Sequence, residues 1–504
     1  MKLLRTVLAA SLMATIVLAR VNQVRAEPSE VGMWSQPREV GVSGVHAVLL
    51  HTGKVLLYSS PEEGPGSKAR LYDPVEGRVE DVTVPFRRDM FCSAPSVMPD
   101  GRVLVAGGEV SPLAALDDLA PPDALPGHRY VLIFDPVTQA WSKAPSMAYA
   151  RYYPSLAELS DGRMLVLSGT DENGDLVDRL EAFDPSTGQW STLPPSADAK
   201  SRLYPRLSLL PDGTLLRAGE DRLGRLFDPA TNTWTDVDAM GYEERRYGGV
   251  VLLPGLTRVL TAGGASDDLT ATRTAEVIDM EAPSPKWTFT GSMHVGRANL
   301  NLVLLPDGTV LAVGGGRWDL YGFGVKSAEL YDPATERWKV MASQQVQRTY
   351  HSTALLLPDG RVLSAGTDLG LRSETVEVYS PPYLFRGPRP AISSAPNALT
   401  YRHAFTINTA QAGDISRVVL VRPGATTHAA NFDQRHVDLA FSPGDRSLTA
   451  VAPANAALAP PGYYMLFILN GAGVPSTATF VHLDKERPAP RPTKGRLPGG
   501  SAGA

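Results

Sequence analysis

The stretch LPDGTVLAVGG (305–315) decides the fold of this chain, because close copies of it recur along most of the sequence. Its Asp-Gly pair predicts a tight hairpin turn, since glycine readily adopts positive φ. The alternating residues that follow predict a strand, and the glycine pair lets backbones pack closely near a centre. The other copies occupy residues 98–108, 159–169, 210–220, 253–264 and 357–367, with a weaker one at 51–60.

A second motif, DPxTxxW after an aromatic residue, follows several copies of the first. It occupies 134–141, 183–190, 227–234 and 331–338, with degenerate copies at 72–79 and 282–287. Asp-Pro starts a turn, and we expect the Trp to pack between neighbouring units. Four short strands in a unit of roughly 35–60 residues are typical of a kelch-type β-propeller blade. Seven copies therefore predict an all-β fold in which residues 40–388 form a seven-bladed kelch-type propeller.

The repeat stops after YSPPYLFRGPRP (379–390), and the rest of the chain has a different character. Residues 389–484 contain strand-like runs without kelch motifs, which predicts a C-terminal immunoglobulin-like β-sandwich. Residues 485–504 are rich in Pro and Gly, which predicts a disordered tail.

The N-terminal residues 1–26 have the pattern of a signal peptide. A basic start is followed by an apolar run over 6–19 and by the small-residue cleavage site VRA (24–26). That run is short for a spanning helix, which needs about 20 residues. We expect a secreted or cell-surface protein; an uncleaved membrane anchor is the alternative, and no other segment is suited to span a bilayer.

The net charge of the chain argues against some classes of binding partner. The net charge is −5, from 48 Lys and Arg against 53 Asp and Glu. This mild acidic excess argues against nucleic acid or an acidic membrane surface as the main partner. We expect a monomer that acts on a small molecule.

Cys92 is the only cysteine among 504 residues, which excludes an intramolecular disulfide. A leftover cysteine in an exported chain indicates intermolecular pairing or a special thiol, whereas a lone cysteine is most often a small buried hydrophobic residue. Cys92, Tyr153 and Tyr350 each precede an Asp-Gly turn by a similar number of residues. The innermost strands of a propeller lie nearest its axis, so this shared phase predicts that the three converge at one mouth of the central channel.

Two histidines lie in segments that we weigh beside these three residues, and of the two His351 shares their convergence. His351 follows Tyr350 directly, and His428 lies in RPGATTHAANFDQRHVDL (422–439) of the C-terminal part. Taken singly, each of these residues is more often structural. We interpret the remaining histidines as structural or surface residues: His46, His51, His128, His294, His403, His436 and His482.

These stretches resemble the copper radical oxidases, the family of galactose oxidase and glyoxal oxidase, over about residues 40–484. The resemblance rests on five segments in matching order: DMFCSAPSVMPDGRVLVAGG (89–108), ARYYPS (150–155), RTYHSTALLLPDGRV (348–362), PGATTHAANFDQRHVDL (423–439) and PPGYYMLFILNGAGVPS (460–476).

The resemblance implies a role for each of five residues. Cys92 would form a thioether to the ring of Tyr153, and Tyr153 would be an equatorial copper ligand and the radical site. His351 and His428 would be the other equatorial ligands. Tyr350 would be the axial ligand and the general base. Imidazole and phenolate are suited to copper(II) with an open position for substrate.

The implied cofactors are one copper ion and the protein-derived Cys92–Tyr153 thioether radical. Copper cycles by one electron, and a protein radical supplies the second electron that alcohol or aldehyde oxidation needs. The implied partners are a small aldehyde or primary alcohol and O2, with hydrogen peroxide as the product. Phe91 and Arg151 flank the motif and are weaker candidates for residues that support the ligands.

The chain departs from galactose oxidase in three places. Asp171 stands where galactose oxidase has a Trp over the thioether, so we expect a missing shield or one supplied from elsewhere, such as Trp318. The sugar-binding groups are not clearly matched, and Arg245 or Arg246 offers only a weak substitute. Because the blades begin soon after the predicted signal peptide, we also expect no N-terminal carbohydrate-binding domain. These departures favour small aldehydes or simple primary alcohols, with galactose or another sugar 6-alcohol as the alternative.

Two further hypotheses remain open. A non-catalytic kelch propeller that binds glycan predicts an incomplete set of five chemical positions, whereas all five are present. A copper-binding protein whose radical does not turn over is compatible with the missing Trp.

Overall fold

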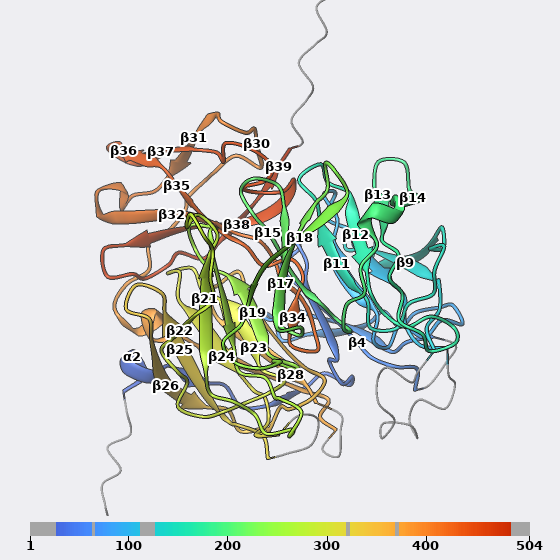
Figure 1. Cartoon of the computed structure of the whole chain (residues 1–504). Coiled ribbons are helices and arrows are strands. Elements are labelled where there is room, and N and C mark those ends of the chain that lie inside the picture. Colours follow the sequence, from blue (N-terminus) through green and yellow to red (C-terminus); the bar gives the residue numbers. More distant parts are fainter. Residues whose placement is uncertain (1–26, 63–65, 111–125, 319–322, 368–371, 485–504) are drawn as a thin grey trace, which may run out of the picture.

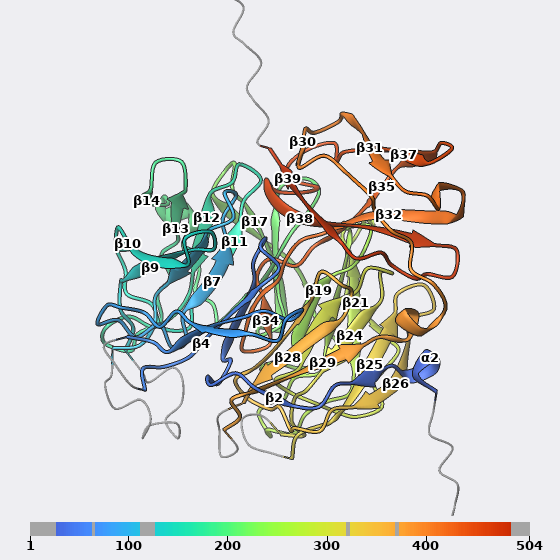
Figure 2. The same ribbon diagram turned by 180° about the vertical axis from the view of Figure 1, so that it is seen from behind.

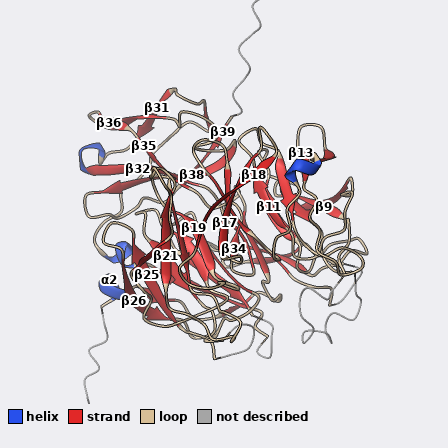
Figure 3. Cartoon of the chain, in the orientation of Figure 1, coloured by secondary structure: helices blue, strands red, loops and turns tan. Residues whose placement is uncertain are grey.

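The computed structural model, seen from two opposite sides in Figure 1 and Figure 2, describes residues 27–62, 66–110, 126–318, 323–367 and 372–484. The predicted signal peptide and tail lie outside the described residues. Strands make up nearly all the regular structure (Figure 3). The described helices are short, and none is long and apolar enough to cross a membrane: α2 (Pro28–Val31), η3 (Pro195–Ala197), η4 (Pro382–Phe385) and η5 (Ala412–Asp414).

Seven sheets repeat one antiparallel pattern, so the predicted all-β, seven-bladed propeller is confirmed. The strands of the first three blades are β3 (His46–Leu49), β4 (Val55–Tyr58), β5 (Ala69–Tyr72), β6 (Val79–Asp81); β7 (Ala94–Val97), β8 (Val103–Ala106), β9 (Val131–Asp135), β10 (Ala140–Ala144); and β11 (Ser155–Glu158), β12 (Met164–Leu167), β13 (Glu181–Asp184), β14 (Gln189–Thr192). Blades four and five are β15 (Arg206–Leu209), β16 (Leu215–Ala218), β17 (Leu223–Asp228), β18 (Thr233–Ala239); and β19 (Gly249–Leu252), β20 (Arg258–Ala262), β21 (Ala275–Asp279), β22 (Thr288–Thr290). Blades six and seven are β23 (Asn301–Leu304), β24 (Val310–Val313), β25 (Ser327–Asp332), β26 (Arg337–Ser343); and β27 (Ser352–Leu356), β28 (Val362–Gly366), β29 (Thr375–Ser380), β1 (Met33–Trp34), β2 (Arg38–Glu39).

The two chain ends of the propeller meet in blade seven. β1 pairs antiparallel with β29, with Met33 opposite Ser380 and Trp34 opposite Tyr379. The N-terminal segment thus supplies the outer strand of a blade whose inner three strands come from the end of the repeat. The innermost strand of this blade, β27, packs on β3 of blade one. This arrangement closes the ring and leaves only short edges exposed.

The glycines of the repeat serve the two purposes expected from the sequence. In the turn, Gly101 has φ +85° and its N–H donates to the carbonyl of Met98 at 2.9 Å. In the glycine pair, Gly108 has φ +135°, and a Cβ there would lie 2.4 Å from the carbonyl oxygen of Asp89. Both positions exclude a side chain, which is why the motif recurs with glycine.

The tryptophans of the second motif join neighbouring blades. The indole N–H of Trp141 donates to the carbonyl of Val82 in blade one at 2.7 Å. The same contact to the preceding blade recurs for Trp190, Trp234 and Trp338. The predicted packing of each Trp between units is therefore present.

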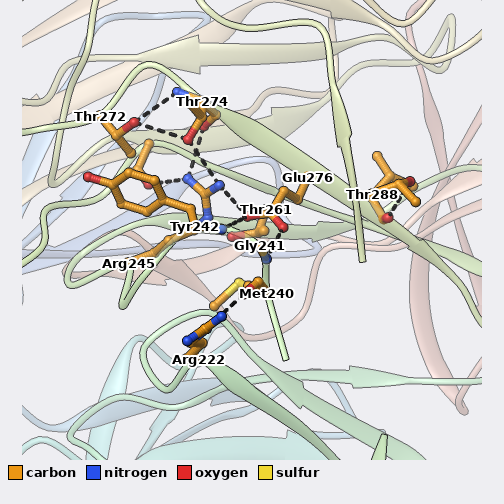
Figure 4. A network of polar contacts seen from close by, with 12 residues as sticks. Arg222, Met240, Gly241, Tyr242, Arg245, Thr261, Thr272, Thr274, Glu276 and Thr288 are labelled. Carbon is orange, nitrogen blue, oxygen red and sulfur yellow. Dashed lines mark hydrogen bonds and ion pairs between the residues drawn. The ribbon is translucent and has the colours of Figure 1, made fainter. Parts of the chain in front are cut away.

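A buried arginine precedes the innermost strand in four blades and pairs with a glutamate of the third strand. These ion pairs are Arg151–Glu181, Arg245–Glu276, Arg297–Glu329 and Arg348–Glu377. Figure 4 shows the second pair, in which Arg245 also donates to the carbonyl and hydroxyl of Thr274. Each pair lies out of water, so its geometry is part of the blade framework.

The C-terminal domain packs two sheets beside the propeller, as the expected sandwich (Figure 1 and Figure 2). Its strands are β30 (Ala398–Leu399), β31 (Ala404–Asn408), β32 (Ile415–Val421), β35 (His436–Leu439), β36 (Phe441–Pro443), β37 (Ser447–Val451), β38 (Gly462–Asn470) and β39 (Thr479–Leu483). A hairpin of β33 (Ala425–Thr427) and β34 (Ala430–Asn431) leaves this domain, and β33 pairs with β3 of blade one. Both views place β34 among the propeller strands.

Candidate metal centre

The residues that begin the innermost strands share an unusual backbone conformation. In six blades, one residue before the innermost strand has a φ between +47° and +62° although it is not glycine. It lies eight positions before the Asp of the Asp-Gly turn, or before Gly255 in blade five. These residues are Cys92, Tyr153, Tyr204, Tyr247, Asn299 and His351. Such residues are strained, and strain of this kind gathers at functional sites. The N–H of Tyr153 donates to the carbonyl of Cys92, and that of Tyr204 to the carbonyl of Tyr153, each at 3.0 Å. Residues far apart in sequence are thus neighbours at the axis.

Blade seven places two candidate site residues, Tyr350 and His351, next to each other before its innermost strand. The segment from Arg348 to the turn is one residue longer than the matching segment from Arg151 in blade three. Counted back from the turn, His351 corresponds to Cys92 and Tyr153. Counted from the buried arginine, Tyr350 is the equivalent, because Arg348 precedes it by the same two residues that separate Arg151 from Tyr153. The prediction that Tyr350 shares the phase of Cys92 and Tyr153 therefore holds when counted from the arginine, whereas His351 holds that phase when counted from the turn.

His428 reaches the centre on the tip of the β33–β34 hairpin. His428 and Ala429 form its two-residue turn with φ +46° and +62°, between the paired residues Thr427 and Ala430. This turn normally favours Asn-Gly, because both residues need positive φ. A histidine at such a position indicates a requirement for its side chain.

All five residues singled out for the metal site lie together and are buried. The hydroxyl groups of Tyr153 and Tyr350 are in hydrogen-bond contact. Sγ of Cys92 lies 3.4 Å from Nε2 of His428. The sulfur of Cys92 and one ring nitrogen each of His351 and His428 all lie within 4.8 Å of one another.

Ring contacts fix the geometry between these side chains. The ring of Tyr350 stacks on that of His351 at 3.8 Å, and His351 meets His428 edge-on at 4.4 Å. The ring of Tyr153 lies 4.7 Å from that of His428. Cys92 and Tyr153 belong to one buried cluster. Two phenol oxygens and two imidazoles therefore face one small volume.

Burial sets the protonation of this group in the absence of a cation. Burial, and then the neighbouring Cys92, raises the pKa of Tyr153 well above its usual value. Burial, and then His351, lowers the pKa of His428 well below its usual value. A neutral imidazole is the form that binds a metal, and a phenolate here needs a compensating positive charge.

A second layer holds the histidines. Oγ1 of Thr427 lies 2.5 Å from Nδ1 of His428, so Nδ1 can donate to it and Nε2 is left as the acceptor that faces the centre. Arg206 donates to the carbonyl of His428 at 3.0 Å. Phe91, a weaker sequence candidate, packs edge-on against His351 at 5.1 Å and so does border the site.

Other sequence candidates lie elsewhere or act on the framework. The Arg151 side chain is bound to Glu181 and to the carbonyls of Ser168 and Arg179. Trp318 is 54% exposed and its backbone pairs with Thr270 of another blade, which places it at the surface and not over the buried Tyr153.

Asp171 shapes a loop beside the site. Its carboxylate accepts the N–H groups of Asn173 and Asp175, which folds residues 171–175 into a tight turn. The loop continues to Leu176, which lines a cavity next to Tyr153. The ring of Tyr153 itself is flanked by Tyr152 at 4.4 Å and by Tyr204 at 4.7 Å.

The cavity beside Tyr153 has a volume of about 220 Å³ and opens to solvent. It mixes apolar, aromatic and charged side chains: Tyr153, Leu176, Arg202, Leu203, Tyr204, Arg206, Glu220, Arg246 and Tyr247. Arg246 lines this cavity, whereas Arg245 is committed to Glu276, so the two alternatives named from the sequence are separated. Sequence reasoning missed Tyr204 and Tyr247, although their distance from the turn, equal to that of Tyr153, is a readable signal.

His46 was interpreted as a structural histidine, yet it lies in the wall of the centre. Its ring centroid is 6.0 Å from that of His428, and its Nε2 accepts the backbone N–H of Cys92 at 3.1 Å. The sequence offered no signal, because His46 precedes its turn in a blade whose motif is degenerate.

Comparison with known proteins gives the same family that the sequence resembles. The family model of the glyoxal oxidase N-terminus matches residues 66–379, and that of the galactose oxidase-like early set domain matches 389–483. A galactose oxidase of Gibberella zeae is 28% identical over 93% of this chain and 73% of its own length. The aldehyde oxidase GLOX of Vitis pseudoreticulata is 27% identical over 88% and 95%. A fungal alcohol oxidase solved in complex with copper has a TM-score of 0.78 at 26% identity, covering 90% of this chain and all of the other.

The chain therefore belongs to the galactose oxidase and glyoxal oxidase family of copper radical oxidases. The residues present fit a copper ion: two phenol oxygens and two imidazoles converge in a buried site, and Thr427 fixes the orientation of one imidazole.

Proposed function

We propose that this chain is an exported oxidase that converts small aldehydes or primary alcohols with O2 and releases hydrogen peroxide. The observation that carries the proposal is the contact between the Tyr153 and Tyr350 hydroxyl groups beside His351 and His428. This donor set lies next to a cavity that is open to solvent. Export rests on the sequence of residues 1–26 alone.

The ligands in this proposal are Tyr153, Tyr350, His351 and His428. A bound copper ion would supply one-electron redox chemistry and would polarise the substrate oxygen. Cys92 would be joined to the Tyr153 ring by a thioether, which lowers the cost of oxidising that ring by one electron.

Two side chains of the protein carry out separate steps of the proposed reaction. Oη of Tyr350 accepts the proton of the substrate hydroxyl, or of the hydrated aldehyde. The oxidised Tyr153 removes a hydrogen atom from the adjacent carbon. The substrate loses two electrons and two protons in total, and O2 takes up both to become hydrogen peroxide. Tyr204 packs on the Tyr153 ring, and Leu203 lines the cavity beside both.

The size of the cavity favours small substrates. About 220 Å³ is below the usual range of 300–1,000 Å³ for drug-sized ligands. Similarity to an aldehyde oxidase supports an aldehyde, and similarity to a galactose oxidase supports a sugar 6-alcohol as the second candidate. Asp171 and the polar groups of Arg202 and Arg246 are compatible with either an aldehyde or a sugar 6-alcohol.

A peroxide assay tests the proposal. Copper-loaded protein is given glyoxal, methylglyoxal, glycolaldehyde or galactose, and peroxide is measured with a coupled peroxidase. We expect turnover with the aldehydes and little with galactose. A preference for galactose would move the substrate to sugars, and no peroxide from any of them would favour a propeller that binds glycan without catalysis.

A further inference from the structure

His46 is tied to the segment that carries Cys92. Its Nε2 accepts the Cys92 backbone N–H at 3.1 Å, and the side chain is fully buried. An imidazole accepts only at a nitrogen that carries no proton, so this hydrogen bond requires a neutral ring protonated on Nδ1. Burial, followed by His351, lowers the pKa of His46 well below its usual value, in agreement with a neutral ring.

Burial of the His46 side chain has an energetic cost at one of its ring nitrogens. Within the described parts of the chain, Nδ1 of His46 is buried and has no hydrogen-bond partner. A buried donor without an acceptor is unfavourable, and an apolar side chain at this position would avoid it. The hydrogen bond that Nε2 accepts from the Cys92 N–H is the polar contact that ties the His46 ring to the site.

A tyrosine reinforces the same contact. The His46 ring stacks on Tyr58 with centroids 4.2 Å apart and planes 5° from parallel. The Tyr58 hydroxyl lies 3.0 Å from Oγ of Ser93, the residue after Cys92. One stacked ring pair thus holds two consecutive residues. Cys92 needs this support, because its backbone has φ +56°.

His46 also fixes Cys92 relative to the hairpin from the other domain. In the pairing of β3 with β33, His46 lies opposite Thr427, which directly precedes His428. Sγ of Cys92 lies 3.4 Å from Nε2 of His428. One residue on β3 therefore sets the distance between the cysteine and a metal-ligand candidate that comes from the C-terminal domain.

We propose that His46 is a positioning residue that holds Cys92 for formation of its bond to Tyr153. The inference rests on the proposed function, since it assumes that this bond forms. In the step, the S–H bond of Cys92 and one ring C–H bond of Tyr153 break and a C–S bond forms. Two electrons and two protons leave, and O2 accepts them as hydrogen peroxide. His46 takes no part in the chemistry and acts through the Cys92 backbone.

The test compares variants at position 46 that keep a hydrogen-bond acceptor for the Cys92 N–H with variants that lose it. In His46→Gln, Oε1 can replace Nε2 as acceptor, whereas His46→Met and His46→Asn remove an acceptor at that reach. His51→Met is the matched control, because His51 stacks on Tyr463 at 4.1 Å beyond the other end of β3. Each copper-free protein receives copper in air, samples are quenched over time, and the linked peptide is quantified by mass spectrometry. Copper binding is measured separately by isothermal titration.

We expect His46→Met and His46→Asn to bind copper but to form the bond about tenfold more slowly, since one hydrogen bond is worth up to about that factor. His46→Gln and His51→Met should stay within about threefold of the wild-type rate on the same scale. Linkage at the wild-type rate in any folded variant without the acceptor would overturn the inference. If the wild-type protein itself forms no linked peptide, the proposed function fails and this inference with it.

Discussion

The ring of Tyr204 packs against that of Tyr153 with centroids 4.7 Å apart, while the Tyr204 hydroxyl donates to the carbonyl of Ser93 at 2.9 Å. The hydrogen bond holds the second ring in place beside the first. Tyr204 and Tyr153 both line the cavity that opens to solvent, so the two rings meet at its wall. A neighbouring aromatic ring thus covers Tyr153, although Asp171 stands where galactose oxidase has its Trp.

Replacing Tyr204 should therefore shorten the lifetime of an oxidised Tyr153. We expect Tyr204→Leu to speed the decay several-fold, because an aromatic pair contributes on the order of 1 kcal/mol and the ring also excludes water. Tyr204→Phe keeps the ring and should decay within about twofold of wild type on the same argument. Decay of the radical absorbance and of its paramagnetic resonance signal after oxidation measures the rate. Equal lifetimes for the Leu variant and wild type would show that Tyr204 is not the cover.

Tyr350→Phe tests the proton acceptor of the proposed reaction. Loss of a positioned general base lowers kcat by about 10²–10⁴-fold. The other three ligands remain, so we expect copper to bind in equal stoichiometry. Tyr247→Phe is the matched control, because the Tyr247 ring lies 5.6 Å from that of Tyr350 but is not among the proposed ligands. Peroxide release at the wild-type rate from Tyr350→Phe would assign the base elsewhere.

Most of the fold was predictable from the sequence, because most blades carry the turn motif and four carry the complete motif with its packing Trp. Closure was not readable: Met33 and Trp34 carry no motif, and only pairing with β29 shows that they complete blade seven. The family resemblance led to the five residues that the structure brings together. The exact phase of Tyr350 and His351 required an alignment on two landmarks, Arg348 and the turn, since the extra residue lies between them.

Residues whose roles depend on contacts between distant parts of the sequence were harder to predict. His46 gains its contact with Cys92 only because blades one and two are neighbours and a distant hairpin pairs with β3. Arg151 was selected for its closeness in sequence to Tyr153, but side chains separated by two residues diverge here, and the guanidinium turns to Glu181. Trp318 was selected for its ring alone, and the structure leaves it at the surface.

Asp89, three residues before Cys92, should make stability depend on pH. Burial raises the pKa of Asp89 to about 7, although its carboxylate accepts the Phe91 N–H at 2.9 Å. The folded state therefore holds this proton up to a higher pH than the unfolded state, where Asp titrates near pH 4. The free energy of unfolding should accordingly fall as pH rises from about 4 to about 7.

Asp89→Asn isolates that contribution, because Asn resembles the protonated acid. The variant should lose less stability than wild type between pH 4 and pH 7, by on the order of 1–3 kcal/mol, since each unit of pKa difference is worth about 1.4 kcal/mol. Urea unfolding at several pH values measures the difference. Parallel pH profiles for the two proteins would show that Asp89 has an ordinary pKa in the folded state.

The buried ion pairs between Arg and Glu should matter for stability rather than for catalysis. Glu181→Ala leaves the Arg151 guanidinium buried without its charge partner, and breaking such a pair costs about 3–5 kcal/mol. Asp236→Ala removes the partner of Arg225 in an exposed pair and should change stability by less than about 1 kcal/mol. Chemical denaturation of both variants gives the comparison. Similar losses for the two would contradict a framework role for the buried pair.

The central claim is that Cys92 is bonded to the ring of Tyr153, and peptide mass spectrometry tests it most directly. Copper-free protein is incubated with copper in air and digested with trypsin, which releases residues 89–102 and 152–163. We expect one linked species, two hydrogen atoms lighter than the sum of these peptides, which is absent without copper and from Cys92→Ser. Recovery of residues 89–102 with a free, alkylatable Cys92 after copper and air would contradict it.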